Sequence, residues 1–258
     1  KPRGGPPLAP GIPEIAAATG SWLLRPVSPG GAPQPAGGQR GRGAAAAGFL
    51  EPLRALLARG APIESVTSHG RTPLMLACQG GHERCARALL EAGADINYMT
   101  PNGPTALMLS CQNGHDLCAR ALLEIGAAVD ATEEDGWTAL MIACENGHEQ
   151  CARALIEAKA NVDVANAKGF VALMHACQMG HDLCARVLIE AKANVEHTNS
   201  NGWTSLMKAC SNGRDLCALA LLEAGADRAR EIPGYAGWNA FKLAERGGHT
   251  AVCELLKG

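Results

Sequence analysis

The sequence predicts an all-α fold built from a repeated pair of short helices. One pattern of glycine, threonine and apolar residues returns at a constant interval, starting at Gly70, Gly103, Gly136, Gly169 and Gly202. A fixed period of this length is typical of proteins in which similar units stack in a row. Each predicted helix spans about 8–10 residues, which is too short to be stable alone in water. Neighbouring units must therefore bury each other's apolar faces.

The unit that begins at Gly136 shows how the pattern specifies two helices. Thr138 comes just before an apolar run, where its hydroxyl can cap the first helix. Gly147 can end that helix, because glycine adopts the left-handed backbone conformation at low cost. A second amphipathic helix starts near Glu149, where an acidic residue suits the helix N-terminus. The unit is therefore two antiparallel helices followed by a turn that projects from them.

Three short motifs recur in phase with this period. They are a Thr-x-Leu-Met opening (Thr138–Met141), a Gly-His pair between the helices (Gly147-His148), and a Gly-Ala-Asp closing segment (Gly93–Asn97). The chain resembles the ankyrin-repeat family over about residues 44–258. The resemblance implies a helix-turn-helix solenoid with projecting β-turns. Met takes the opening position that the family usually fills with His, and it cannot form the hydrogen bonds of that His.

The resemblance also implies a division of the repeat domain. We expect a degenerate N-terminal capping repeat at 44–67, five full repeats at 68–231 and a C-terminal capping repeat at 235–258. Two extra residues precede Gly237, and we expect them in a projecting turn, where insertions are tolerated. Terminal repeats of such stacks are usually atypical because they cap the core.

Residues 1–43 differ from the rest in composition. They contain nine Pro and ten Gly, and five basic residues against one acidic residue, a net charge of +4. Since the whole chain carries −2, the remainder carries −6. We predict a disordered tail that is solvated or part of a longer chain, with an organelle-targeting segment or a weak tether to anionic surfaces as alternatives. The stretch 37–47 is too rich in glycine to predict a stable helix.

Ten of the eleven cysteines form pairs seven residues apart, with a His between them in most repeats. The pattern C-x3-H-x2-C, as in Cys144, His148 and Cys151, permits a metal site. However, both cysteines lie on apolar stripes, and the resemblance places the His at the helix-helix turn. Equivalent cysteines of neighbouring repeats should lie about 10 Å apart, beyond the reach of a disulfide. We predict buried, reduced, structural cysteines without metal, in a cytoplasmic or nuclear compartment.

No set of catalytic residues is recognisable, so we predict neither enzyme activity nor a cofactor. The sequence lacks a phosphate-binding glycine loop and a nucleophile elbow. Repeated arginines and glutamates, such as Arg87 and Glu91, are expected to form exposed ion pairs four residues apart. The acidic repeats disfavour nucleic acid as a partner, and no segment is long and apolar enough to span a membrane. We expect a monomer.

The resemblance implies that the projecting turns and first helices line a concave face that binds proteins. The residues after the opening glycines belong to this face: Arg71, Pro104, Trp137, Phe170, Trp203 and Trp238. Large aromatic residues concentrate at binding hot spots, and only 3% of the chain is aromatic. We predict a partner-binding stripe of these residues, rimmed by Glu134, Asp135 and Lys168, with His175 and Lys208 nearby. The alternative is that each ring packs on the next turn as a spacer.

Asn97 is a possible site of asparagine hydroxylation. It follows Asp-Ile and lies eight residues after Leu89, which resembles the pattern modified in this family. The alternative is that Asn97 supports its own turn, as turn asparagines commonly do.

Taken together, these features predict a scaffold that recognises a protein or peptide. Two alternatives stay open at this stage. The chain could be an accessory module of a longer polypeptide with a catalytic or zinc domain, or its cysteines could make it responsive to metal or redox conditions.

Overall fold

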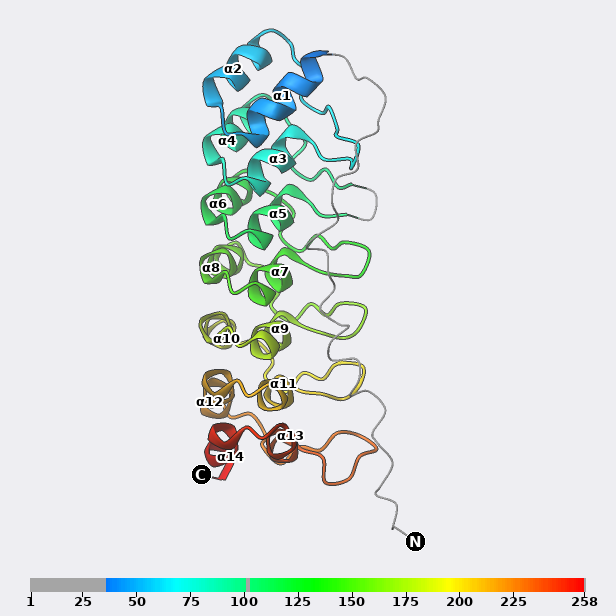
Figure 1. Cartoon of the computed structure of the whole chain (residues 1–258), viewed down its shortest axis with the longest axis vertical. Coiled ribbons are helices and arrows are strands. Elements are labelled where there is room, and N and C mark those ends of the chain that lie inside the picture. Colours follow the sequence, from blue (N-terminus) through cyan, green and yellow to red (C-terminus); the bar gives the residue numbers. More distant parts are fainter. Residues whose placement is uncertain (1–35, 101–102, 258) are drawn as a thin grey trace. The chain divides into compact units, whose positions relative to one another are not determined.

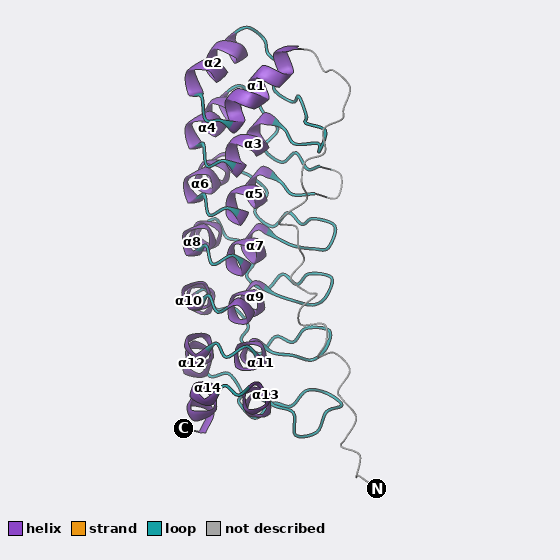
Figure 2. Cartoon of the chain, in the orientation of Figure 1, coloured by secondary structure: helices purple, strands orange, loops and turns teal. Residues whose placement is uncertain are grey.

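A computed structural model describes residues 36–100 and 103–257 of the chain. This part contains 14 α-helices and a single isolated β-bridge, between Glu231 and Asn239 (Figure 2). The helices follow one another as pairs: α1 (Ala36–Ala46) and α2 (Leu50–Ala58), α3 (Pro73–Gln79) and α4 (Glu83–Glu91), α5 (Ala106–Gln112) and α6 (Asp116–Ile125), α7 (Ala139–Glu145) and α8 (Glu149–Glu157), α9 (Ala172–Met179) and α10 (Asp182–Glu190), α11 (Ser205–Ser211) and α12 (Asp215–Glu223), and α13 (Ala240–Gly247) and α14 (Thr250–Lys257).

The pairs stack in chain order, so that two rows of helices form (Figure 1). Each first helix packs on the first helix of the next pair, and each second helix packs on the next second helix. The turns project beside the row of first helices. The core lies between the rows and consists mainly of Leu, Met, Ala and Cys side chains. The predicted all-α repeat stack is confirmed.

A threonine caps the first helix of most repeats, as expected for Thr138. Its Oγ1 accepts a hydrogen bond from the Met141 backbone N–H at 3.3 Å. The same bond forms at Thr72, Thr105 and Thr204, at 3.2–3.3 Å. Met141 itself is buried in the core. In the fourth full repeat Val171 occupies this position, and it forms no such bond.

The recurrent Gly-His pair joins neighbouring repeats. His181 Nε2 lies 3.0 Å from the carbonyl oxygen of Glu145 in the preceding repeat. Gly147 has φ +74°, and a Cβ there would lie only 2.5 Å from His181 Nδ1. Glycine is therefore required both for the backbone conformation and for the close approach of the next imidazole. Equivalent bonds, at 3.0–3.2 Å, are made by His82, His115, His148 and His249.

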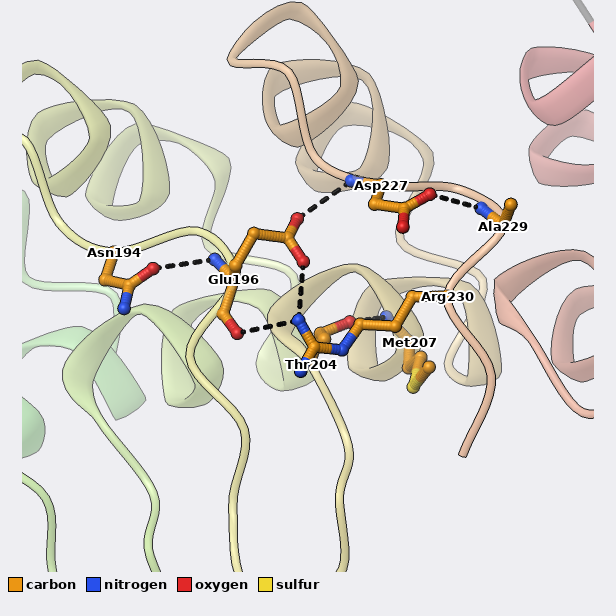
Figure 3. Close-up of polar contacts among 7 residues, drawn as sticks. All are labelled: Asn194, Glu196, Thr204, Met207, Asp227, Ala229 and Arg230. Carbon is orange, nitrogen blue, oxygen red and sulfur yellow. Dashed lines mark hydrogen bonds and ion pairs between the residues drawn. The ribbon is translucent and has the colours of Figure 1, made fainter. Parts of the chain in front are cut away.

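A ladder of side-chain hydrogen bonds connects the closing segments of successive repeats (Figure 3). Glu196 accepts a bond from the Asp227 N–H of the next repeat at 2.8 Å, and it forms an ion pair with Arg230 at 3.1 Å. Asn194 accepts from the Glu196 N–H at 3.0 Å. A bond of this kind, from a backbone N–H to a side chain of the preceding closing segment, recurs along the stack. One example is the 2.8 Å bond from the Ala128 N–H to Asn97 Oδ1. Each closing segment is thus fixed by the one before it.

The N-terminal end of the stack corrects one expectation. The glycine-rich stretch that was predicted not to form a helix lies largely within α1, which begins at Ala36. Ala44 and Ala45 of α1 are buried against the core, and Arg42 donates a hydrogen bond to the Val66 carbonyl at 2.8 Å. Packing on α2 and α3 therefore offsets the low helix propensity of the glycines. The tail predicted at 1–43 lies mostly outside the described residues.

The repeated arginines also pair differently from the expectation. Arg87 does not pair with Glu91, four residues later; it pairs with Glu83, four residues earlier, and with Glu124 of the next repeat at 3.0 Å. Similar links between repeats join Arg120 to Glu157, Arg153 to Glu190 and Arg186 to Glu223. These exposed pairs contribute at most about 1 kcal/mol each.

The two extra residues lie in the last projecting turn, as expected. This turn is closed by a 2.8 Å bond from the Ile232 N–H to the Trp238 carbonyl, and Tyr235 N–H donates to the Ile232 carbonyl at 3.0 Å. Ile232 is buried beside Met207 and Leu243. The insertion therefore enlarges the turn while its base stays attached to the stack.

Candidate protein-binding surface

The residues Trp137, Phe170, Trp203 and Trp238, here called the aromatic row, lie at the base of four successive projecting turns. Each ring is half-buried, so part of it packs on the stack and part faces solvent. A polar side chain four residues earlier holds two of the rings in place. Asn166 Oδ1 accepts from the Phe170 N–H at 2.9 Å, and Asn199 Oδ1 accepts from the Trp203 N–H at 3.0 Å.

His175 of α9 lies between two rings of the aromatic row. Its ring centroid is 4.3 Å from that of Trp137 and 5.3 Å from that of Phe170. The side chain is 6% exposed, and its Nε2 has no hydrogen-bond partner among the described residues. Burial, together with the nearby charge of Lys208, lowers the pKa of His175 from 6.5 to about 3. The imidazole is therefore neutral near pH 7, with one ring nitrogen unpaired.

Lys208 of α11 continues this arrangement into the next repeat. Its Nζ lies 4.6 Å from the Phe170 centroid and 4.8 Å from the Trp203 centroid, within the range of cation–π attraction. The side chain is half-buried, and it forms no ion pair within the described part of the chain. Burial lowers the pKa of Lys208 to about 8. Five side chains thus follow one another along the stack, in the order Trp137, His175, Phe170, Lys208 and Trp203.

The position of His175 and Lys208 in their helices is apolar in the other repeats. Five residues after the ring position, those repeats carry Leu76, Leu109, Ile142 and Leu243. The sequence placed His175 and Lys208 near the stripe but did not show that they fill the spaces between rings. The polar residues His175 and Lys208 stand out only when this one helix position is compared across all repeats.

The other predicted site residues lie in the turns or at the ends of the row. Glu134, Asp135 and Lys168 are exposed at the tips of the turns. The backbone carbonyls of Asp135 and Lys168 accept bonds from the next turn, from the N–H of Ala167 at 3.0 Å and of Ser200 at 3.2 Å. Glu134 and Asp135 precede Trp137 by three and two residues, and Lys168 precedes Phe170 by two, so that their exposed side chains lie in the same turns as these rings.

Arg71 and Trp238 stand at the two ends of the stripe. Arg71 is half-buried and donates to the Gln79 side chain of its own repeat. Trp238 lies under Arg246, with 5.2 Å from the guanidinium carbon to the ring centroid. The alternating contacts that involve His175 and Lys208 join Trp137, Phe170 and Trp203, but not Arg71.

An acidic group lies in the turn that carries Trp137. Glu133 Oε1 is buried and has no hydrogen-bond partner among the described residues. Burial, and secondarily the charge of Asp135, raises the pKa of the Glu133 carboxyl. With Glu134 and Asp135 exposed beside it, the Trp137 end of the row is negative, whereas the Phe170–Trp203 end carries Lys208. The row therefore has a charge gradient along its length.

The cysteines form diagonal pairs between neighbouring repeats. The Cys78 thiol of α3 is hydrogen-bonded to that of Cys118, in the second helix of the next repeat. Equivalent contacts join Cys111 to Cys151, Cys144 to Cys184 and Cys177 to Cys217. These diagonal pairs were not predicted from the sequence, where only equivalent cysteines were expected to be neighbours. All eleven thiols are free, and only Cys253 is not fully buried. The thiol hydrogen bond, with burial, raises the pKa of Cys78.

The His of the C-x3-H-x2-C pattern bonds to a carbonyl of the preceding repeat, as described above for His181. No group of three or more potential metal ligands lies together among residues 36–100 and 103–257. No helix in these ranges is long and apolar enough to cross a membrane.

Comparison with known proteins identifies the repeats. The family model "Ankyrin repeats (3 copies)" matches four overlapping segments, residues 43–133, 92–166, 125–199 and 159–232. The crystal structure of the human ASB11 ankyrin repeat domain is similar with a TM-score of 0.74 and 31% sequence identity, over 84% of this chain and 97% of that one. No curated protein matches the chain by sequence.

Proposed function

Because the chain belongs to the ankyrin-repeat family, whose domains are generally protein-interaction modules, we propose that it binds a protein or peptide through its aromatic row. The rings lie on the turns and first helices, the side of the stack that the family uses for recognition. We further propose that the chain acts as a monomeric scaffold, without catalysis, in the cytoplasm or nucleus.

The observation that carries this proposal is the alignment of Trp137, Phe170 and Trp203 in three adjacent repeats. Stacked repeats place equivalent residues about 10 Å apart. Large rings that are partly exposed and held in fixed positions lose little conformational entropy on binding, which suits them to be anchors. The stack itself does not need them, since Arg71 and Pro104 occupy the same position in earlier repeats.

The shape and charge of the row favour an elongated ligand. An extended peptide, or a helix with apolar residues at regular spacing, can contact all three rings. Glu134 and Asp135 at the Trp137 end favour a positive charge on the ligand there. The net charge of −6 outside residues 1–43 disfavours nucleic acid as the ligand.

A pull-down with the wild-type chain beside a Trp137→Ala/Trp203→Ala double variant tests the proposal. The matched control is Leu216→Ala, which removes a 52% exposed apolar side chain from α12, in the row of second helices. We expect a protein that is retained by the wild type and by the control but lost from the double variant. Circular dichroism melting must show that all three chains are folded. Retention by the double variant would place the binding site elsewhere.

A further inference from the structure

Two polar groups lie next to the rings, one without a hydrogen-bond partner and one without an anionic partner among the described residues. His175 Nε2 is buried and unbonded, and the Lys208 ammonium has no anionic partner among the described residues. Burying such groups costs stability unless a partner satisfies them. Four other repeats avoid this cost with Leu or Ile at the same helix position, so stacking does not require polar residues there. Lys208, which is only half-buried, is therefore expected to meet an anion of the ligand.

We propose that the partner places an acidic side chain between Phe170 and Trp203, where its carboxylate pairs with Lys208 Nζ. This inference rests on the proposed function and specifies the chemistry of its ligand. Apolar residues on either side of the acidic residue contact the rings of Trp137 and Trp203. The ligand is thus an acidic residue within an apolar segment.

Charge complementarity selects an anion at this position. Lys208 already occupies the faces of Phe170 and Trp203 as the cation, and a second cation from the ligand would be repelled. A carboxylate accepts hydrogen bonds, and the Lys208 ammonium can donate them. Because Lys208 is half-buried, a charge-assisted hydrogen bond to its ammonium group is stronger there than in water.

The charge gradient also fixes the direction of the ligand. Its acidic residue lies near Lys208, and a basic residue lies near Glu134 and Asp135, next to Trp137. The rings of Trp137 and Trp203 are two repeats apart, roughly 20 Å. In an extended peptide this separation corresponds to about six residues. Because the acidic residue lies between Phe170 and Trp203, we expect it about four to five residues from the basic residue.

Selection from a library of random peptides, about 16 residues long so that an extended chain spans the row, tests this inference. The wild-type chain is the bait, and enriched peptides are then synthesised with the acidic residue intact or replaced by its amide. By calorimetry, we expect the amide form to bind the wild type about tenfold more weakly, the loss of one charge-assisted contact. Against Lys208→Leu, which copies Leu243 of the last repeat, the two forms should bind equally.

His175→Leu, which copies Leu109, should leave the preference for the acidic peptide over its amide form unchanged, because His175 Nε2 is buried. Loss of that preference in this variant would assign the anion to His175 and overturn Lys208 as its partner. A peptide with phosphoserine in place of the acidic residue tests whether the site prefers a phosphate or a carboxylate. Tighter binding of the phosphoserine peptide by more than about tenfold would assign the site to phosphate and overturn the carboxylate.

The remaining outcomes separate the inference from the proposed function. Enriched peptides that require Trp203 but carry no acidic residue would overturn the inference and leave the aromatic row as the binding site. Peptides that bind the Trp137→Ala/Trp203→Ala variant as well as the wild type, or a selection that enriches none, would contradict the proposed function and the inference together.

Discussion

The imidazole of His175 lies 4.3 Å from the indole of Trp137, centroid to centroid, although the two residues belong to neighbouring repeats. The planes of the two rings meet at 39°. This contact buries a titratable group in a position where the preceding repeats carry Leu or Ile. Burying the imidazole lowers the free energy of unfolding, and this decrease can be measured.

We predict that His175→Leu stabilises the protein, and more so in acid. In the folded state the pKa of His175 is about 3, below the unfolded value of 6.5. Between these values the unfolded state binds more protons, so wild-type stability falls as the pH falls through this window. The gain from the substitution should therefore grow by about 1–3 kcal/mol between about pH 7 and pH 4. Urea unfolding at both pH values measures it.

Ile142→Leu, at the same position one repeat earlier, serves as the control because it removes no titratable group. A gain from His175→Leu that does not change with pH would show that the imidazole is solvated or paired in the folded protein.

The fourth full repeat should be the least stable, because it lacks one cap and has strained helix ends before and within it. Val171 forms no capping bond. A missing cap costs about 0.5–2 kcal/mol. Lys159 and Lys192 both have a positive φ, in the left-handed region. A non-glycine residue carries a penalty of roughly 1 kcal/mol in this conformation.

Val171→Thr and Lys192→Gly should each raise the free energy of unfolding, measured in denaturant. Gly225 already has a positive φ, so Gly225→Lys should have the opposite effect. No gain from either of the first two variants would show that neither the cap nor the helix end limits the stability of this repeat.

The cysteines should be inert in the native protein. Ten of them are buried, out of reach of a thiol reagent. The neighbouring thiol and burial raise the pKa of Cys78, Cys111, Cys144 and Cys177, which disfavours the reactive thiolate, whereas the neighbouring thiol lowers the pKa of Cys118, Cys184 and Cys217. Burial raises the pKa of Cys210 to about 12. We expect slow labelling of all cysteines except Cys253 in the native state, and fast labelling in denaturant. Rapid native labelling of most thiols, or zinc bound in stoichiometric amounts, would contradict this.

Asn97 should gain one oxygen atom on incubation with an asparagine hydroxylase. It is exposed, although its Oδ1 accepts the 2.8 Å bond from Ala128 N–H, so the modifying enzyme must compete with this contact. Asn194, which aligns with Asp95 three repeats earlier and has Arg186 eight residues before it, is the control. Mass spectrometry measures the masses of the peptides that contain Asn97 and Asn194. An unchanged mass of the Asn97 peptide would leave this residue with a role in the turn only.

The repeat architecture was readable from the sequence because many short signals agree in phase. Thr138, Gly147 and His148 each predict a local feature that the structure confirms. The helix at α1 was missed for a physical reason. Its glycines have low helix propensity. The burial of Ala44 and Ala45 that compensates for it depends on neighbouring helices.

The site was only partly readable for a similar reason. The aromatic row follows from the period, but the contacts of His175 and Lys208 connect side chains of different repeats. The diagonal pairing of Cys78 with Cys118 has the same origin. A periodic sequence aligns equivalent positions, whereas contacts between non-equivalent positions depend on how the helices pack.

The central claim is that the aromatic row binds the partner, and single substitutions test it most directly. Trp137→Ala and Trp203→Ala are measured for affinity by calorimetry, with the recovered partner or a selected peptide, and for stability by thermal melting. We predict a loss of about 2 kcal/mol or more in binding, about 30-fold in affinity, with little change in melting temperature. Strongly lowered melting temperatures, with unchanged affinity per folded molecule, would show that the rings are spacers and that the partner binds elsewhere.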